Sequence, residues 1–561
     1  MKKIIFLFAI ATLFSCSDFL DVTPKGVLSD AQVSSPDKVD NTVNAAYASL
    51  GNDHYITPFS LWPYGNVRSG DAYKGGRDEG DIQAFYFMET FKNVKSDFGE
   101  MDALWFQYYV GISRANSALK TLNTLTEADF PKLKIRQAEC RFIRAHYYFQ
   151  LKELWKYVPF IDETIAIADY PSISNRALTN DQMWDKIADD FKFGVDNLPA
   201  IQTEIGRANK AAATAYLAKT RLFQAYEQDD RNNVTSINAT KLQQVVDLIN
   251  TIPATYGLVA DYADLFTPGA TENGNESLFA IQFSNKGDGT TFGRLNFGDV
   301  LATPMGIGCC DFHKPSKNLA NAFKTDANGL PMFDTYDAAP LDLSTDKVDP
   351  RLNHTIAIPG HPWKYDPTTI YQESWNRTPD VYGVYASLKE NVCKTCYTQV
   401  GPFYGNTKNR MILRFADVLL MKAEALIELG GGANLETARQ IINQIRTRAA
   451  NSTAHLKMAD NSFESKFNVG TYGLAGWDQS YARKALRWER RLELAMEGNR
   501  FFDLVRWGIA DTYMNGYFAS EKTKIAYLKN GLFTKNRDEY LPIPDNQMRF
   551  SKGVYIQNAG Y

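Results

Sequence analysis

Apolar residues recur at helical spacing along much of this 561-residue chain. Leu104, Tyr108, Ile112, Ala115 and Leu119 follow one another at steps of three or four residues, which places them on one face of an α-helix. The same spacing recurs in 138–149, 211–225 and 418–449. Each such helix must bury its apolar face against a neighbour, so we predict a mainly α-helical body.

Three consecutive glycines, Gly430 to Gly432, interrupt the stretch 418–449. Glycine readily adopts the left-handed conformation that ends a helix, so one helix is expected to stop there and a second to follow. Two helices joined by a tight turn form an αα-hairpin, the unit of tetratricopeptide-like arrays. No clean repeat of about 34 residues accompanies the hairpin, which weakens the case for a regular array.

The helical pattern gives way between residues 271 and 410 to a stretch dominated by Gly, Pro, Asn and aromatic residues. One strand is predicted there, because Phe279, Ile281 and Phe283 alternate with other residues. Long irregular segments inside a compact domain are usually functional, so we expect ligand specificity to lie in this insertion. The predicted organisation is one compact unit with two regions, helical 16–270 and insertion-bearing 271–561.

The first residues have the pattern of a secretory signal peptide. Two lysines precede a short apolar run, and a small residue stands before Cys16. The run is too short to span a bilayer core of about 30 Å. The tetrapeptide Leu13-Phe14-Ser15-Cys16 resembles a bacterial lipobox. That resemblance implies removal of residues 1–15 and fatty acylation (palmitate) of Cys16, which would tether the mature protein to a membrane.

Cysteine usage agrees with an oxidising compartment outside the cytoplasm. Four cysteines lie in the insertion: Cys309, Cys310, Cys393 and Cys396. They allow three connectivities, and disulfides are expected, with free thiols or a metal site that includes His313 as alternatives. A zinc site lacks its second spaced pair because two of the four are adjacent, so we predict no metal. Cys140 lies in a helical pattern and is predicted to be a buried thiol.

Composition and missing motifs exclude several functions. The formal net charge is −3 and no basic run is present, which argues against nucleic-acid binding. Zinc-protease, serine-hydrolase and phosphate-loop motifs are absent, and no cofactor is predicted. A glycoside hydrolase needs only two carboxylates, and 64 acidic residues leave that alternative open. We nevertheless predict a binding protein and not an enzyme.

Aromatic and polar residues gather in three segments flanked by glycine and proline, a pattern typical of loops. The apolar faces of sugar rings pack on aromatic rings, and their hydroxyl groups need polar partners. The candidate ligand-binding residues are Trp62, Tyr64, Arg68, Asp71, Tyr73, Lys74, Trp363, Trp375, Asn376, Tyr382 and Tyr385. Most tryptophans are at least partly buried, so any one of these rings could instead belong to the core. Trp155, Trp184, Trp488 and Trp507 lie in helical patterns and are assigned to the core.

Five blocks, in this order along the chain, resemble the signatures of the SusD/RagB family. They are 138–151 (AECRFIRAHYYFQL), 206–213 (GRANKAAA), 414–425 (RFADVLLMKAEA), 489–508 (ERRLELAMEGNRFFDLVRWG) and 541–561. The resemblance implies a SusD-like helical scaffold with tetratricopeptide-like hairpins and a glycan- or peptide-binding face. It also implies a lipoprotein that faces the cell exterior from the outer membrane. In that setting it would deliver oligosaccharide to a SusC-like TonB-dependent transporter for nutrient uptake.

Two further expectations concern the ligand and the fourth block. A glycan is favoured over a peptide, because the candidate loops pair Trp and Tyr with Asn, Asp and Arg, whereas a peptide site more often offers a strand edge or an apolar groove. A RagB-like peptide-capture protein remains the alternative. The stretch 489–506 is expected to form one helix laced by i,i+3 ion pairs. The expected pairs are Arg490–Glu493, Glu497–Arg500 and Asp503–Arg506.

Overall fold

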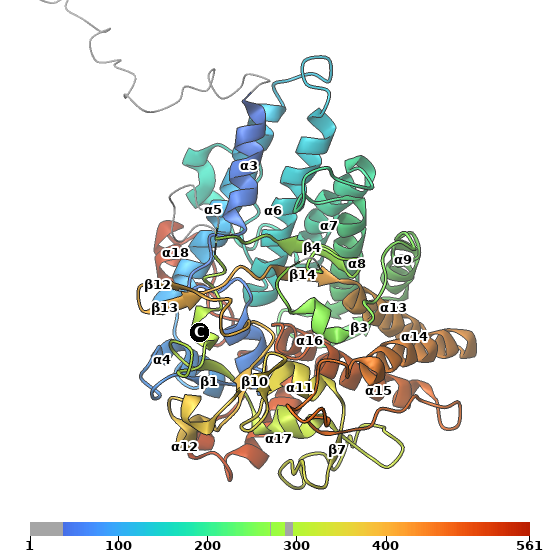
Figure 1. Cartoon of the computed structure of the whole chain (residues 1–561). Coiled ribbons are helices and arrows are strands. Elements are labelled where there is room, and N and C mark those ends of the chain that lie inside the picture. Colours follow the sequence, from blue (N-terminus) through green and yellow to red (C-terminus); the bar gives the residue numbers. More distant parts are fainter. Residues whose placement is uncertain (1–37, 270, 286–294) are drawn as a thin grey trace, which may run out of the picture.

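Neighbouring helices packed side by side form one half of the molecule (Figure 1). The computed structural model describes residues 38–269, 271–285 and 295–561. The predicted signal peptide and Cys16 lie outside these residues. In the helical half each helix packs on the next along the chain, from α5 to α9. Its members are α3 (Val39–Ser49), α5 (Gly99–Leu122), α6 (Leu133–Trp155), α7 (Asn180–Asn197), α8 (Lys210–Ala225) and α9 (Ala239–Asn250).

Side-chain caps fix where several of these helices begin. The Thr179 hydroxyl accepts a hydrogen bond from the Gln182 backbone N–H, and the Gln182 side chain accepts one from the Thr179 N–H, which is a capping box. Asn209 and Asn238 cap α8 and α9 in the simpler way, each by accepting a bond from a backbone N–H three residues on. The predicted apolar stripes on α5, α6 and α8 are buried, which confirms those helices.

The C-terminal helices pack against this first set through α13, which contacts both α8 and α9. They are α13 (Phe415–Leu429), α14 (Gly432–Asn451), α15 (Gln479–Glu493), α16 (Arg500–Arg506), α17 (Ala510–Glu521) and α18 (Asp545–Phe550). The predicted αα-hairpin is confirmed: α13 and α14 pack together, and Gly430 and Gly431 make the turn with φ of 72° and 86°.

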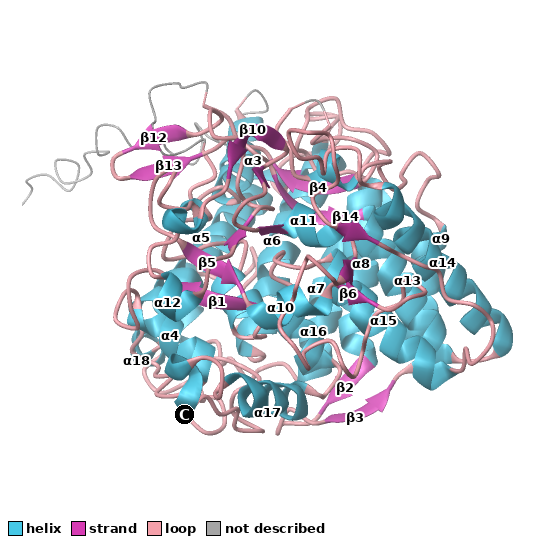
Figure 2. Ribbon diagram, turned by 60° about the horizontal axis from the view of Figure 1, so that its bottom comes forward, coloured by secondary structure: helices cyan, strands magenta, loops and turns pink. Residues whose placement is uncertain are grey.

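Short helices and strands connect the long ones, most of them in the 271–410 insertion (Figure 2). The short helices are α4 (Gln83–Thr90), α10 (Lys317–Ala322), α11 (Arg351–Thr355) and α12 (Pro379–Tyr382), with the π-helix η1 (Trp62–Val67) and the 3-10 helices η2 (Ile167–Ser172), η3 (Tyr262–Leu265), η4 (Val300–Ala302), η5 (Glu373–Trp375) and η6 (Ala526–Asn530). The predicted strand is confirmed as β4 (Ser277–Ile281), which pairs antiparallel with β14 (Arg410–Arg414).

The remaining strands pair as β1 (Ala72–Gly75) with β5 (Phe312–Pro315), β2 (Tyr226–Gln228) with β3 (Val234–Ile237), β8 (Ile356–Ala357) with β11 (Ala386–Ser387), β9 (Pro362–Trp363) with β10 (Asp366–Ile370), β12 (Thr398–Val400) with β13 (Phe403–Gly405), and β7 (Lys347–Val348) between β6 (Lys324–Thr325) and β15 (Lys466–Phe467). Each sheet has two or three strands in the part of the chain that the structure describes. The sheets therefore pin loops to the helical body and do not form a core of their own.

The expectation of one continuous helix over 489–506 is wrong. α15 ends at Glu493, and α16 begins at Arg500, because Met496 and Gly498 have φ of 64° and 80° and turn the chain between them. Of the three expected i,i+3 pairs, Asp503–Arg506 forms, at 2.7 Å. Arg490 instead binds Asp417 and Asp503, so its partners come from other helices.

Glu493 is the centre of a buried ion network. Its carboxylate binds the guanidinium groups of Arg351 at 2.9 Å and Arg414 at 2.5 Å, and also that of Arg448. All four side chains are at most 4% exposed. Burial by itself would raise the pKa of Glu493, but the three arginines outweigh it and hold that pKa well below its ordinary value. The network joins α11, β14, α14 and α15.

Glu493→Gln should therefore destabilise the protein strongly. The substitution removes one negatively charged partner from each of three buried guanidinium groups. Breaking a buried ion pair costs about 3–5 kcal/mol. Chemical denaturation of the folded protein measures the loss. The matched control is Lys192→Ala, which removes an exposed i,i+4 pair with Asp196 and should change stability by less than about 1 kcal/mol. Equal losses in the two variants would contradict the role of the network.

Candidate functional site

The structure buries most of the predicted ligand-binding residues. Ten of the eleven are at most 9% exposed: Trp62, Tyr64, Arg68, Asp71, Tyr73, Lys74, Trp363, Trp375, Asn376 and Tyr382. Tyr385 is half-buried. The expectation of loops is wrong for seven of the ten, which lie in η1 (Trp62, Tyr64), β1 (Tyr73, Lys74), β9 (Trp363), η5 (Trp375) and α12 (Tyr382). Arg68, Asp71 and Asn376 do lie in turns or loops, but they are buried as well. Flanking glycine and proline mark helix and strand ends there.

The charged residues of the first segment find partners inside the protein. Asp71 binds Arg491 of α15 at 2.7 Å. The Lys74 ammonium donates to the backbone carbonyls of Asp78 and Asp81 at 2.8 and 2.6 Å. Arg68 donates to a carbonyl near the C-terminus, that of Asp538. The Asp71 and Arg68 partners lie more than 400 residues away in the sequence. The sequence therefore gave no local sign that these charges would be satisfied internally.

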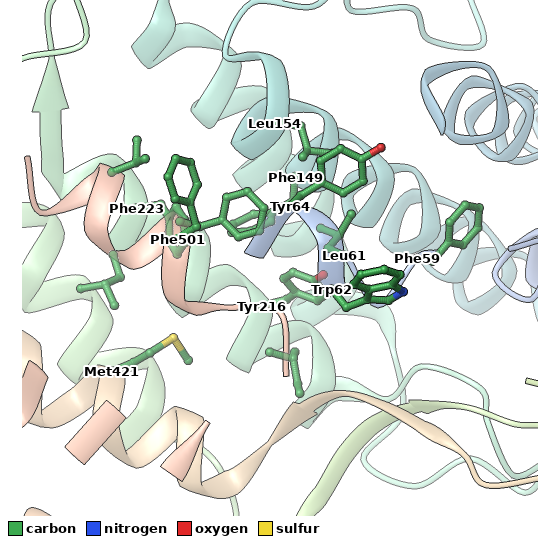
Figure 3. Close-up of a cluster of buried hydrophobic side chains, with 14 of the residues drawn as sticks. Phe59, Leu61, Trp62, Tyr64, Phe149, Leu154, Tyr216, Phe223, Met421 and Phe501 are labelled. Carbon is green, nitrogen blue, oxygen red and sulfur yellow. The ribbon is translucent and has the colours of Figure 1, made fainter. Parts of the chain in front are cut away.

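Trp62 lies among buried rings (Figure 3). It also lines a partly open pocket. Phe59, Phe149 and Tyr216 also line it. The pocket measures about 120 Å³, which is smaller than ligand pockets of roughly 300–1,000 Å³. The Trp62 indole N–H has no partner within the described protein.

Trp363 and Trp375 belong to a small separate core with Tyr371. Trp363 and Tyr371 stack with ring centres 5.8 Å apart, and Trp375 meets both rings edge-on. The Trp363 indole N–H donates to the backbone carbonyl of Val392 at 2.9 Å. Asn376 accepts hydrogen bonds from the Lys314 ammonium and the Tyr371 hydroxyl at 2.6 and 2.8 Å. This small core supports a surface loop that packs on its rings.

That surface is the loop 304–310, which lies directly on aromatic rings. The Met305 N–H donates to the Trp375 carbonyl at 2.8 Å. Gly306 packs so closely on the Trp375 indole that a Cβ atom there would lie 2.1 Å from the ring. Gly308 packs in the same way on Tyr404 of β13, where a Cβ atom would lie 2.2 Å from the ring. Glycine is required at both positions because no side chain fits between backbone and ring.

We call this surface the Trp375 platform and define it by Met305, Ile307, Cys309, Trp375 and Tyr404. Met305 is 42% exposed, and Ile307, Cys309 and Tyr404 are half-buried, so apolar and aromatic groups meet solvent together. In both views the β12–β13 hairpin that carries Tyr404 lies on the left side of the molecule (Figures 1 and 2).

Polar side chains surround the platform. The exposed Lys394 places its ammonium 5.3 Å from the centre of the Trp375 ring. Gln399, exposed on β12, is the register partner of Tyr404. Arg377 follows Trp375 by two residues and binds Asp81 at 3.1 Å. An apolar surface with donors and acceptors at its edge is the combination that a sugar ring requires.

The cysteines of the insertion form two disulfides, Cys309–Cys310 and Cys393–Cys396. Disulfides are the expected state of these four cysteines, and Cys140 is a buried free thiol, as predicted. Among the residues with defined positions, no group of three His, Cys, Asp or Glu side chains is placed to hold a metal ion.

Sequence reasoning found Trp375 but missed Met305, Tyr404 and Lys394. The alternating glycines at 306 and 308 were the available signal, since they mark backbone that passes close to bulky groups. Their partner rings lie about 70 and 100 residues further along the chain, a separation across which spacing arguments carry no information.

The fold defines the class of this protein: a mainly helical scaffold with short strands and long connecting loops. Residues 275–561 match the model of the SusD family, and residues 18–222 match a family described as "Starch-binding associating with outer membrane". The first match covers more than half of the chain. The chain belongs to the SusD family, and the description of its N-terminal match associates it with starch binding and the outer membrane.

Relatives of similar sequence align with this chain along most or all of its length. SusD-like protein P2 of Formosa agariphila is 25% identical over 574 aligned positions, which cover 100% of this chain and 99% of the relative. A SusD-like protein of Bacteroides ovatus is 25% identical and covers 90% of this chain and 82% of its own length. Within the described residues, no helix is both long and apolar enough to cross a membrane.

Solved structures share the fold. A laminarin-binding SusD-like protein superposes with a TM-score of 0.66 at 22% identity, covering 94% of this chain and 99% of its own. Surface glycan-binding protein A of Bacteroides thetaiotaomicron, in complex with laminarihexaose, gives 0.61 at 20% identity, with 93% and 99% covered. A SusD-like protein of Bacteroides fragilis gives 0.70 at 22%, with 95% and 99% covered. These likenesses confirm the predicted fold class.

Glu153, which lines the same pocket as Trp62, should make stability depend on pH. Burial raises the pKa of its carboxyl from 4.5 to about 8, against a smaller opposing effect of the Lys219 ammonium. The fold therefore favours the protonated form, so this contribution to stability is complete below about pH 4.5 and is lost as the pH rises through about 8. Glu153→Gln, which does not titrate, should lose less stability than wild type between pH 5 and 8 in thermal denaturation. Parallel curves for the two proteins would contradict the assignment.

Proposed function

We propose that this protein binds oligosaccharide on the Trp375 platform and delivers it to a SusC-like TonB-dependent transporter. The observation that carries the proposal is the platform itself. Met305 is 42% exposed and Tyr404 is half-buried, and the loop that carries Met305 packs on the Trp375 and Tyr404 rings through Gly306 and Gly308. Lys394 and Gln399 stand at its edge, available to hydroxyl groups. Two structural relatives are described as binding laminarin and laminarihexaose, which makes laminarihexaose the first ligand to test.

The predicted site residues take two different parts in this proposal. Trp375 supports the binding loop directly, and Asn376 fixes the turn behind it through Lys314 and Tyr371. Trp363 belongs to the same supporting core. The first segment, from Trp62 to Lys74, contributes to the scaffold, because its candidate side chains are buried and the charged ones, Arg68, Asp71 and Lys74, are paired inside the protein.

Peptide capture is the second candidate function, and one observation favours it. In the described chain β4 pairs with β14 on one edge, and a groove of about 550 Å³ runs past Leu278 and Ala280 beside it. Ile201 and Ile205 line this groove and are 83% and 75% exposed. A free strand edge next to exposed apolar side chains is a surface to which an extended peptide can add as a strand.

Removing platform side chains should weaken glycan binding. Met305→Ala and Tyr404→Ala each take away part of the apolar surface, and truncation at a binding hot spot costs on the order of 1–2 kcal/mol, about 5- to 30-fold in Kd. Calorimetry with laminarihexaose measures the change. Leu474→Ala is the control, because Leu474 is 69% exposed in the connection between α14 and α15, away from the platform.

Several outcomes of that experiment separate the candidate functions. Unchanged binding in folded Met305→Ala and Tyr404→Ala would place the glycan elsewhere. Retention of peptides and no glycan by the wild type would favour the β4 groove. Mass spectrometry of the same incubations should show oligosaccharide of unaltered length, because we propose a binding protein without catalysis, and shortened chains would contradict that.

Cys16→Ala should release the protein from the outer membrane. Without its acyl chains the mature chain has no anchor of its own in this proposal, so it should move to the soluble fraction of lysed cells.

Wild-type protein on intact cells should be removed by added protease, because we propose that it faces the exterior. It should also co-purify with a TonB-dependent transporter in mild detergent. A protease-resistant wild type would contradict the proposed orientation.

A further inference from the structure

Both disulfides of the described chain lie at the Trp375 platform. Cys309 is itself a platform residue, in the loop that rests on Trp375 and Tyr404. Cys393 and Cys396 enclose the turn that carries Lys394, whose ammonium lies 5.3 Å from the Trp375 ring centre. Cys140, the remaining cysteine of the described residues, is a free thiol buried in α6. Both disulfides of the described residues therefore lie where the ligand is proposed to bind.

Neither disulfide is placed to stabilise the protein as a whole. The bonds join residues one and three positions apart. A disulfide restricts the unfolded chain more when it closes a longer loop, so these two restrict it least. Cys310 belongs to the edge of the large core and Cys309 packs against it, whereas Cys393 and Cys396 are not part of that core. What such short bonds do fix is the local path of the backbone, here the loop 304–310 and the turn 393–396.

A small number of backbone hydrogen bonds also hold these two segments. In 304–310 they run from Met305 to Trp375, from Ile307 and Gly308 back to Pro304, and from Cys310 to Leu301. The Cys393–Cys396 turn has one backbone bond, from the Cys396 N–H to the Cys393 carbonyl at 2.9 Å. Segments with few backbone bonds and half-exposed side chains open most easily, so losing the covalent bonds should loosen them.

We propose that oligosaccharide binding at the Trp375 platform requires its two disulfides, so that the oxidised protein binds ligand and the reduced protein releases it. This inference rests on the function proposed above. Oxidation holds the loop 304–310 against the Trp375 and Tyr404 rings and holds Lys394 near Trp375, which preorganises the surface before the ligand arrives. Reduction leaves the helical body intact and frees both segments.

Accessibility decides which bond reacts first. Cys396 is exposed and Cys393 is half-buried, whereas Cys310 is buried. The thiolate of an external dithiol attacks the Cys396 sulfur, the Cys393 sulfur leaves as a thiolate and takes up a proton, and a mixed disulfide remains. The second thiol of the reductant then displaces Cys396 as a thiol and closes a cyclic disulfide. Two electrons and two protons pass from the dithiol to the protein.

The test compares binding of laminarihexaose by oxidised and dithiothreitol-reduced mature protein. Reduction should weaken binding by about tenfold or more, the scale of losing one strong contact, and reoxidation should restore it. The double variant Cys393→Ser/Cys396→Ser and the double variant Cys309→Ser/Cys310→Ser should bind weakly without reductant. Cys140→Ser is the matched control and should respond to reductant as the wild type does. Equal binding in the oxidised and reduced states would overturn the inference.

A second measurement keeps this inference separate from the proposed function. Hydrogen exchange of the ligand-free protein should rise on reduction in 304–310 and 393–400 and stay unchanged in α5 and α6. If the oxidised protein binds no glycan but hydrogen exchange still rises on reduction, the proposed function is wrong and the structural role of the disulfides stands. Unchanged exchange in both segments would overturn the structural role of the disulfides, whatever the ligand.

Discussion

Glu493 is a buried carboxylate held by three guanidinium groups, and the arrangement of the C-terminal half depends on it. An unpaired charge in the interior is strongly unfavourable, so the carboxylate and its arginines are stable only when they come together. Arg351, Arg414 and Arg448 reach it from segments that lie 142, 79 and 45 residues away in the sequence. Their meeting fixes α11, β14 and α14 around the end of α15.

The same network determines where the insertion returns to the helical body. Arg414 ends β14, and Arg410 at its start donates to the Leu50 carbonyl after α3 and binds Asp53. β14 is therefore held at one end by the C-terminal helices and at the other by the N-terminal region. Tyr404 lies six residues before Arg410, so this anchoring also places one wall of the Trp375 platform. Charge burial in the core thus positions groups at the surface.

The candidate site could be predicted only in part from the sequence. Trp375 was identified because an aromatic residue stood beside Asn and Arg, and it does support the proposed surface. Trp62 and Tyr73 had equally promising neighbours, yet they are 1% and 0% exposed. Local composition is the same for a ring that faces solvent and a ring that packs under another segment. The difference is the arrival of distant residues, such as Arg491 on Asp71.

The sequence by itself determined the helices, the αα-hairpin at Gly430, the strand at β4 and the family to which the chain belongs. These features depend on residues a few positions apart, whose spacing matches the period of a helix or strand, and on blocks of local sequence. Tertiary structure alone decided which rings are exposed, which cysteines pair and which charges are buried. Those outcomes depend on contacts between residues up to several hundred positions apart. Local propensity does not predict such contacts. The free energy that selects them comes from burying groups against distant partners, and only the folded chain brings those partners together.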